Sequence, residues 1–373
     1  MQRLIVVLPH LISDPEQESF LRQKLPDLER LSEASTVFEL LPIERAVTPE
    51  SALLGLSPGL VELADGPLTC SWLGVDPPDR SVQFHVSLLH LDEQGMLHRI
   101  DVDEEIAPVL SRLDRPRWTF VPGRGPDHAL VWEEGSLELG THPPADGMDY
   151  RTHRPEGDGE TVLRSWIEDS VDLLSNHPMN NEREDKGLLE ANIAWPWGPG
   201  FRNAVPNLPL RRGRLTKVIT GSRRLSGLSR LARYRLGDPT ILGPGLAPQW
   251  DRLATEMATE DSLVVHVQAF ERIQREERVD LGARWWEQFS ERCVRVLLER
   301  PEDQDFELWI LAPGGNLTEG QTPARASSHG LGLRYRSVSP GSSTIPFDER
   351  ALGDGRLKKL ALWEVLDSAL GGS

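Results

Sequence analysis

The chain has 373 residues, 38% of them hydrophobic and 27% charged, a composition typical of a globular protein with one large domain or two smaller ones. Its formal net charge of −17 argues against general binding to nucleic acid, and no apolar stretch approaches the roughly 20 residues of a membrane helix. Because the two cysteines, Cys70 and Cys293, are too few for a disulfide framework, we expect a cytoplasmic protein.

Apolar runs alternate with helical spacings along the chain, as they do in α/β proteins. Residues 4–8 are a continuous apolar run, which predicts a buried strand of a parallel sheet. A helix is expected over residues 20–31, bent or divided at Pro26, because its apolar residues recur at helical intervals. Three further strands are predicted between turns rich in Pro and Gly, at residues 81–90, 117–121 and 128–132.

The second half of the chain continues this alternation. Apolar spacing predicts helices at residues 163–174, 250–257, 281–297 and 356–370, and strands at 263–267 and 306–311. The first of these helices ends before His177-Pro178, since Pro disfavours helical backbone in the residue before it. Trp285 and Trp286 cannot enter the same groove, so we expect Trp286 at a flank or an interface.

The stretch from His177 to Gly200, HPMNNEREDKGLLEANIAWPWGPG, combines His, Asn, Arg and Trp with many Pro and Gly residues. Pro removes backbone donors and Gly permits positive φ, so a specific irregular path is expected rather than a plain helix or strand. Buried Asn and His side chains need a partner for each polar atom. From these residues alone, a structural loop and a functional loop are both open interpretations.

This stretch resembles the "HPxN…R…G…AN…W…WGxG" segment of the archaeal-type cofactor-independent phosphoglycerate mutases, which belong to the alkaline phosphatase superfamily. The resemblance is closest to the bacterial RpfE-type regulatory, phosphoglycerate-mutase-like proteins. It implies an α/β fold: an alkaline-phosphatase-like core with a mostly parallel central sheet flanked by helices, plus an inserted α+β cap domain. Residues 1–81 and 191–373 would form the core and residues 82–190 the cap, which in the family closes over the substrate.

In this family, the Ser of a Gly-Ser-Asp turn is the nucleophile that takes the phosphoryl group. Residues 48–49 (TP) and 73–77 (LGVDP) resemble the family elements that flank this turn. Counting back from the second element, Asp65 occupies the nucleophile position. An Asp can form an acyl phosphate, and Thr69 or Ser71 can take the role after a register shift. Loss of the nucleophile without replacement is the simplest interpretation.

The metal-ligand positions of the family are also changed. By the resemblance they fall here on His10, Glu271, Arg275, Gly314 and Gly315, with His329 matching the final metal-binding His. A His fits poorly in an oxygen-rich site, an Arg offers no lone pair, and a Gly has no side-chain donor atom. Glu271 can still supply an oxygen ligand, but one or two retained ligands do not make a metal site. We therefore expect neither a bound metal nor another cofactor.

The segment from Ala191 to Gly237 contains ten basic residues and no Asp or Glu. Guanidinium groups suit the recognition of phosphate and carboxylate groups. The candidate residues for binding an anion, here and in the motif above, are His177, Asn180, Arg183, Asn192, Arg211, Arg212, Arg223, Arg224 and Arg230. A small phosphorylated or carboxylated ligand, an acidic protein partner or the protein's own acidic cap fits such a surface. Alternatively, the basic residues form a solvated face that is paired with nearby carboxylates.

These changes predict a degenerate, mutase-like pseudoenzyme with a regulatory role or a role in binding an anionic ligand or a partner. The alternative is an active phosphoglycerate mutase, or a related phosphotransferase, whose rebuilt site uses Mn²⁺, Mg²⁺ or Zn²⁺. A nucleic-acid-binding regulator is disfavoured by the net charge of −17, and no membrane association is expected.

Overall fold

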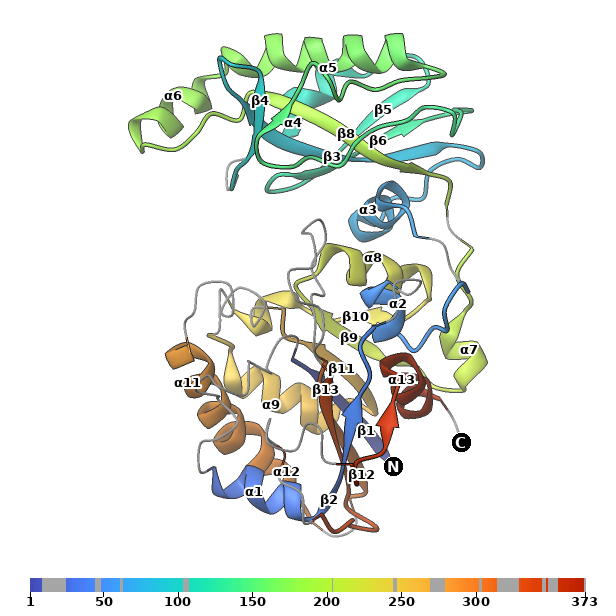
Figure 1. Cartoon of the computed structure of the whole chain (residues 1–373), viewed down its shortest axis with the longest axis vertical. Helices are drawn as coiled ribbons and strands as arrows, with labels where there is room; N and C mark the ends of the chain where they lie inside the picture. Colours follow the sequence, from blue (N-terminus) through green and yellow to red (C-terminus); the bar gives the residue numbers. More distant parts are fainter. Residues whose placement is uncertain are drawn as a thin grey trace. The chain divides into compact units, whose positions relative to one another are not determined.

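The computed structural model describes residues 1–8, 25–43, 48–60, 63–102, 107–202, 204–243, 247–268, 279–301, 304–313, 329–343, 347 and 355–371. The chain divides into two compact units (Figure 1). The first unit comprises Met1–Val61 and Pro206–Ser373, and the second comprises Glu62–Val205. None of the helices within the described ranges combines the length and the apolar character that crossing a bilayer requires.

The first unit is built on an eight-stranded sheet in which only one strand, β13, runs antiparallel to its neighbours. The strands follow the order β10 (Arg235–Leu236), β9 (Lys217–Thr220), β11 (Ser262–His266), β1 (Gln2–Val7), β12 (Phe306–Ala312), β13 (Gly330–Arg336), β2 (Ser35–Leu40) and β14 (Lys359–Leu360). The predicted strands at 4–8, 263–267 and 306–311 are confirmed as the central β1, β11 and β12. Their apolar runs are continuous because central parallel strands are buried on both faces.

Helices cover this sheet (Figure 1). They are α1 (Pro26–Glu33), α2 (Pro49–Leu53), α7 (Leu208–Arg212), α8 (Arg223–Leu231), α9 (Trp250–Thr259), α11 (Val279–Phe289), α12 (Arg295–Leu298) and α13 (Leu362–Leu370). The predicted helix at 281–297 is confirmed as α11 and α12 joined by a π-helical turn at Ser290–Val294. The last helix begins later than predicted, at Leu362, because Lys359 and Leu360 pair with β2 as strand β14.

The prediction for Trp286 was wrong. Trp285 and Trp286 are both buried, and their rings meet edge to face with centroids 5.7 Å apart. Helix α11 is enclosed on more than one side: Trp285 lies against Trp250 of α9, while Trp286 packs edge-on against Phe289. Adjacent side chains can therefore point in different directions and still both be buried.

The second unit contains a six-stranded sheet whose pairings are all antiparallel. Its strands are β3 (Val82–Leu91), β4 (Met96–Arg99), β5 (Trp118–Arg124), β6 (Asp127–Trp132), β7 (Met148–Asp149) and β8 (Ile193–Gly200). Its helices are α3 (Asp65–Leu73), α4 (Ala107–Leu110), α5 (Glu160–Ser175) and α6 (Pro178–Asp185), with a 3₁₀ turn at Ser111–Leu113. The predicted strands and the amphipathic helix at 163–174 are confirmed here as β3, β5, β6 and α5.

The second unit, Glu62–Val205, is longer than residues 82–190, and the division into core and cap stays a prediction. Strand β8 pairs with β3 along most of its length, for example Leu88 with Ala194. Helix α3 packs directly on the backbone of β3, where the position of a Cβ on Gly66 would overlap the carbonyl oxygen of Gln83. Residues on both sides of the predicted cap thus contribute to the hydrophobic core of the second unit.

Candidate functional site

The predicted nucleophile position, Asp65, is the first residue of helix α3 in the second unit. Ala64 precedes it in an extended conformation and offers no side chain to cap the helix. A carboxylate in the first turn interacts favourably with the positive end of the helix dipole. Asp65 is half-buried, and its backbone carbonyl accepts a hydrogen bond of 2.8 Å from Thr69 Oγ1.

The beginning of α3 fits against β3 and β8 only because three positions are glycine. An ideal Cβ on Gly66 would lie 1.8 Å from the carbonyl oxygen of Gln83. Likewise, a Cβ on Gly198 would lie 2.7 Å from the Cβ of Asp65, and one on Gly200 would lie 2.5 Å from the Cβ of Ala64. By the resemblance, Gly66 matches the Asp that follows the nucleophilic Ser in the family. This backbone has no room for that carboxylate.

Thr69, one alternative nucleophile, is committed to a buried polar network. Its side chain is fully buried, and its Oγ1 lies 3.0 Å from Nδ1 of His85 on β3. The other ring nitrogen, Nε2, lies 3.1 Å from both Ser87 Oγ and Asp127 Oδ1. Ser87 also accepts a hydrogen bond from the indole N–H of Trp197. A hydroxyl group with no exposed surface cannot attack a substrate from solution, so Thr69 is a structural residue.

The second alternative, Ser71, is also buried on α3, with 7% of its surface exposed. Its neighbour Cys70 is buried too, and desolvation raises the pKa of that thiol to about 12. A thiol with such a pKa stays protonated and unreactive near neutral pH. None of the hydroxyl or thiol groups of α3 is therefore presented as an activated nucleophile.

The motif residues of the second unit lie close together, but their polar atoms serve its own backbone. His177 caps α6, and its Nδ1 accepts a hydrogen bond from the backbone N–H of Met179. Asn180 is buried; its amide nitrogen donates to the carbonyls of Leu174 and Ala191, and its Oδ1 accepts from the N–H of Ala191. Asn180 thus ties the end of α5 to the segment before β8.

The remaining two motif residues act similarly. Arg183 is almost fully buried and donates from Nε to the carbonyl of Leu189 and from a terminal nitrogen to that of Asp101, each at 2.8 Å. Asn192 exchanges hydrogen bonds with both backbone groups of Leu91. These contacts give the Asn and Arg residues of the motif a structural role, while their role in binding an anion stays a prediction.

The candidate arginines of the first unit are distributed over two helices. Arg212 of α7 is buried and donates to the carbonyls of Leu54 and Gly55, to Tyr234 Oη and to the carboxylate of Asp367. It therefore connects four segments that are distant in the sequence. Its neighbour Arg211 is exposed.

On α8, Arg224 forms an ion pair of 3.2 Å with the buried Glu50, and Arg223 occupies the first position of the helix. Arg230, near the end of α8, is exposed. The helix begins at Ser222, whose side chain caps Leu225 N–H. Two of the five candidate arginines, Arg212 and Arg224, are thus paired with carboxylates of the same unit.

Five of the predicted degenerate metal positions lie outside the described residues: His10, Glu271, Arg275, Gly314 and Gly315. His329 is described, immediately before β13. Its Nδ1 lies 3.4 Å from Oε1 of the buried Glu39, which also lies 3.5 Å from Lys359 Nζ. Within the described part of the chain, no three His, Cys, Asp or Glu side chains are grouped so that they could hold a metal ion.

A second histidine, His266, ends β11. It is buried, its Nδ1 lies 2.9 Å from Thr220 Oγ1, and its Nε2 has no hydrogen-bond partner among the described residues. Burial lowers its pKa to about 4, so the ring is neutral near pH 7. His266 is thus a strand residue of the core, as the sequence predicts.

Three arginines that the sequence does not single out surround Glu307 at the amino ends of β1 and β12: Arg3, Arg334 and Arg336. The residues lie in three strands far apart in the sequence, so their proximity depends on the strand order. The spacing of Arg334 and Arg336 is the one available indication, because residues two apart in a strand share a face.

Comparison with known proteins gives relatives but no family model that matches the chain. The chain is 28% identical over 184 residues to a probable 2,3-bisphosphoglycerate-independent phosphoglycerate mutase of Geobacter sulfurreducens, spanning 46% of each chain and thus less than half of that relative. It is 26% identical over 326 residues to the 2,3-bisphosphoglycerate-independent phosphoglycerate mutase of Methanosarcina mazei, covering 82% of this chain and 81% of the relative.

Solved structures agree with these relatives. The cofactor-independent phosphoglycerate mutase of Thermoplasma acidophilum superposes with a TM-score of 0.64 over 99% of both chains at 20% identity. A protein from Pyrococcus horikoshii gives 0.72 at 13% identity, over 99% of this chain and 97% of the other. The predicted α/β fold of the alkaline phosphatase type is thereby confirmed. The homologues of the chain are cofactor-independent phosphoglycerate mutases, while the closer likeness to RpfE-type proteins stays a prediction.

Proposed function

We propose that this protein is a degenerate phosphoglycerate-mutase-like protein, which does not interconvert phosphoglycerates and acts by binding an anionic ligand or a protein partner. The observation that carries the proposal is the pair Asp65-Gly66 at the start of α3. By the resemblance, the position of the nucleophilic Ser is held here by Asp65, and the next position is closed to any side chain by the carbonyl of Gln83.

The chemistry of the family explains why these changes matter. Phosphoryl transfer of this type needs an activated nucleophile and metal ions that neutralise the developing charge. By the resemblance, an Arg and two glycines stand at three metal-ligand positions, Arg275, Gly314 and Gly315, and none of them can donate a lone pair. Removing single members of such a catalytic set typically costs orders of magnitude in rate.

The direct test is an assay of the full chain with 3-phosphoglycerate, in which ³¹P NMR follows formation of 2-phosphoglycerate. Mn²⁺, Mg²⁺ and Zn²⁺ are supplied in separate reactions, and the Methanosarcina mazei relative serves as the positive control. We expect no conversion above the protein-free blank. Metal-dependent turnover that Asp65→Asn abolishes would support the alternative, an active mutase that uses an aspartyl phosphate.

Ligand binding is tested separately, because a pseudoenzyme of this kind can retain affinity for a phosphorylated acid. Isothermal titration calorimetry with 3-phosphoglycerate measures that affinity directly. Saturable binding without conversion would identify an anionic ligand as the retained function. Absence of both binding and conversion would favour a protein partner, to be sought by cross-linking and mass spectrometry with the full chain.

A further inference from the structure

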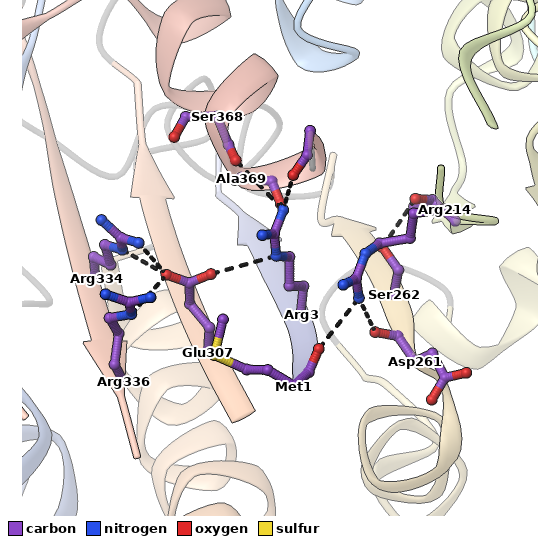
Figure 2. Close-up of polar contacts among 12 residues, drawn as sticks. Met1, Arg3, Arg214, Asp261, Ser262, Glu307, Arg334, Arg336, Ser368 and Ala369 are labelled. Atoms are coloured by element: carbon purple, nitrogen blue, oxygen red, sulfur yellow. Dashed lines mark hydrogen bonds and ion pairs between the residues drawn. The ribbon is translucent and has the colours of Figure 1, made fainter. Parts of the chain in front are cut away.

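Five charged side chains lie at one end of the sheet of the first unit and form what we call the Glu307 cluster: Glu307, the three arginines paired with it, Arg3, Arg334 and Arg336, and Arg214, whose charge acts on Arg3 (Figure 2). The sheet registers bring most of them together. Arg3 of β1 is the partner of Glu307 on β12, and Glu307 is in turn opposite Arg336 on β13. Arg214 follows helix α7 and reaches the same end of the sheet. This end holds the starts of β1 and β12.

The arginines approach one buried carboxylate from two sides (Figure 2). Arg334 places Nε at 2.6 Å and a terminal nitrogen at 2.5 Å from Glu307 Oε1, and Arg336 Nε lies 3.5 Å from the same oxygen. Arg3 Nε lies 3.6 Å from the other oxygen, Oε2. The guanidinium of Arg334 also stacks over the ring of Trp309, 4.7 Å from its centroid, which fixes its orientation.

The charges of this cluster do not balance. Three guanidinium groups face one carboxylate, and Arg214 adds a further positive charge close enough to act on Arg3, so positive charge exceeds negative charge within the cluster, in a protein whose net charge is −17. Arg214 donates to the carbonyls of Met1 and Asp261, at 3.3 and 3.1 Å, and among the described residues it forms no ion pair. Burial is the main cause that lowers the pKa of Arg3, and repulsion by Arg214 lowers it further.

Part of this charge is open to solvent. The side chains of Arg334 and Arg336 are 33% and 44% exposed, and Arg214 is half-buried. Arg3, in contrast, is a supporting residue. Its terminal nitrogen donates to the carbonyls of Ala369 and Gly371 at the end of α13. The exposed guanidinium groups retain N–H donors beyond those used by Glu307, since each Arg carries five.

We propose that the Glu307 cluster binds a small polyvalent oxyanion, a phosphate ester or a pyrophosphate group. Guanidinium groups bind phosphate oxygens in pairs, and a ligand with two or more negative charges offsets the surplus here. Two exposed arginines converge on one carboxylate rather than spreading along a face, which favours a compact ligand over an extended acidic chain. The site lies at the amino ends of β1 and β12, so it does not depend on the fate of the mutase chemistry.

The test is isothermal titration calorimetry of the full chain with inorganic pyrophosphate at low ionic strength. We expect saturable 1:1 binding that weakens as salt increases. Arg336→Gln and Arg214→Gln should each raise the Kd about tenfold or more, the usual effect of losing a hydrogen bond to a charged group. Arg252→Gln is the matched control, because Arg252 is an exposed arginine of the same unit whose partner is Asp238. It should leave the Kd unchanged.

Three results would overturn the proposal. The first is no binding to a chain whose circular dichroism spectrum shows that it is folded. The second is that Arg336→Gln and Arg214→Gln leave binding intact while Arg224→Gln abolishes it. This result would assign the anion to α8. The third is tighter binding of hexaglutamate than of pyrophosphate with the same dependence on Arg336, which would assign the cluster to an acidic protein partner. None of these results depends on whether the protein turns over 3-phosphoglycerate.

Discussion

His266 Nδ1 and Thr220 Oγ1 lie 2.9 Å apart, buried at the ends of the adjacent parallel strands β11 and β9. The hydrogen bond satisfies one ring nitrogen, while Nε2 has no partner within the described part of the chain. Burial lowers the pKa of His266 to about 4, so the folded first unit contains a neutral imidazole throughout the physiological range.

This pKa makes stability depend on pH. An unfolded His has a pKa of about 6.5. Between roughly pH 6.5 and 4, the ring of His266 is therefore mostly protonated in the unfolded chain and mostly neutral in the folded chain. We expect the free energy of unfolding to decrease on acidification through this window, by roughly 2–3 kcal/mol from this residue. Urea unfolding at pH 7, 6 and 5 measures the effect.

Two variants separate the causes of this dependence. His266→Gln should flatten the pH dependence, because its side chain does not titrate. Thr220→Val should lower stability at every pH yet keep the dependence, since burial rather than the hydroxyl group lowers the pKa. Equal slopes for the wild type and His266→Gln would show that the ring is protonated in the folded protein.

Gly66→Asp should destabilise the second unit strongly. A Cβ at this position would lie 1.8 Å from the Gln83 carbonyl oxygen, so α3 must move away from β3, at a cost of about 3 kcal/mol or more. Gly355→Asp is the control, because nothing lies within 4 Å of a Cβ built there, and it should change stability by less than about 0.5 kcal/mol. Urea midpoints followed by tryptophan fluorescence compare the two. Similar midpoints would remove the steric argument for lost catalysis.

Asn180→Ala should cost about 2–3 kcal/mol of folding free energy, because it removes the hydrogen bonds of Asn180 to the N–H and carbonyl of Ala191 and one of those that the carbonyl of Leu174 accepts. The adjacent Asn181 is exposed, so Asn181→Ala is a matched control with an expected change below about 0.5 kcal/mol. Thermal unfolding compares the pair. If the two variants are equally stable while ligand affinity drops only for Asn180→Ala, the residue is a binding residue instead.

Arg212→Lys should destabilise the first unit by about 2 kcal/mol, although it preserves the charge. A Lys cannot reproduce the fork that reaches Leu54, Gly55 and Asp367 at once. The same substitution at the exposed neighbour Arg211 should be nearly neutral. Urea unfolding measures both, and a neutral result for Arg212→Lys would mean that its charge alone suffices.

The central elements could be read from the sequence because their patterns are local. The apolar runs of β1, β11 and β12 reflect burial on both faces, and the helical spacing in α5 reflects its single buried face. The roles of the polar residues could not be read in this way. Arg183 binds the carbonyl of Asp101, a contact set by tertiary packing rather than by any local pattern.

The same limit applies to the candidate sites. Two arginines of one strand, Arg334 and Arg336, predict a shared face, but the strand order decides that Glu307 lies beside them. The closure of the Gly66 position likewise depends on the close approach of α3 to β3. The Asp at position 65 suggests, by the resemblance, that the family's nucleophile is absent. The tight contact of α3 with β3 gives a physical reason for the glycine at position 66.

The hydrogen bonds of Arg3 and Arg212 to α13 also bear on the order in which the protein is made. The second unit is one continuous segment, so its sheet can form while the ribosome is still adding later residues. The first unit must wait, because two of its buried guanidinium groups meet the carbonyl of Ala369 and the carboxylate of Asp367 only after translation has reached the last helix. Until then, the amino end of β1 and helix α7 lack these two contacts, so the first unit is completed only when the last helix has been made.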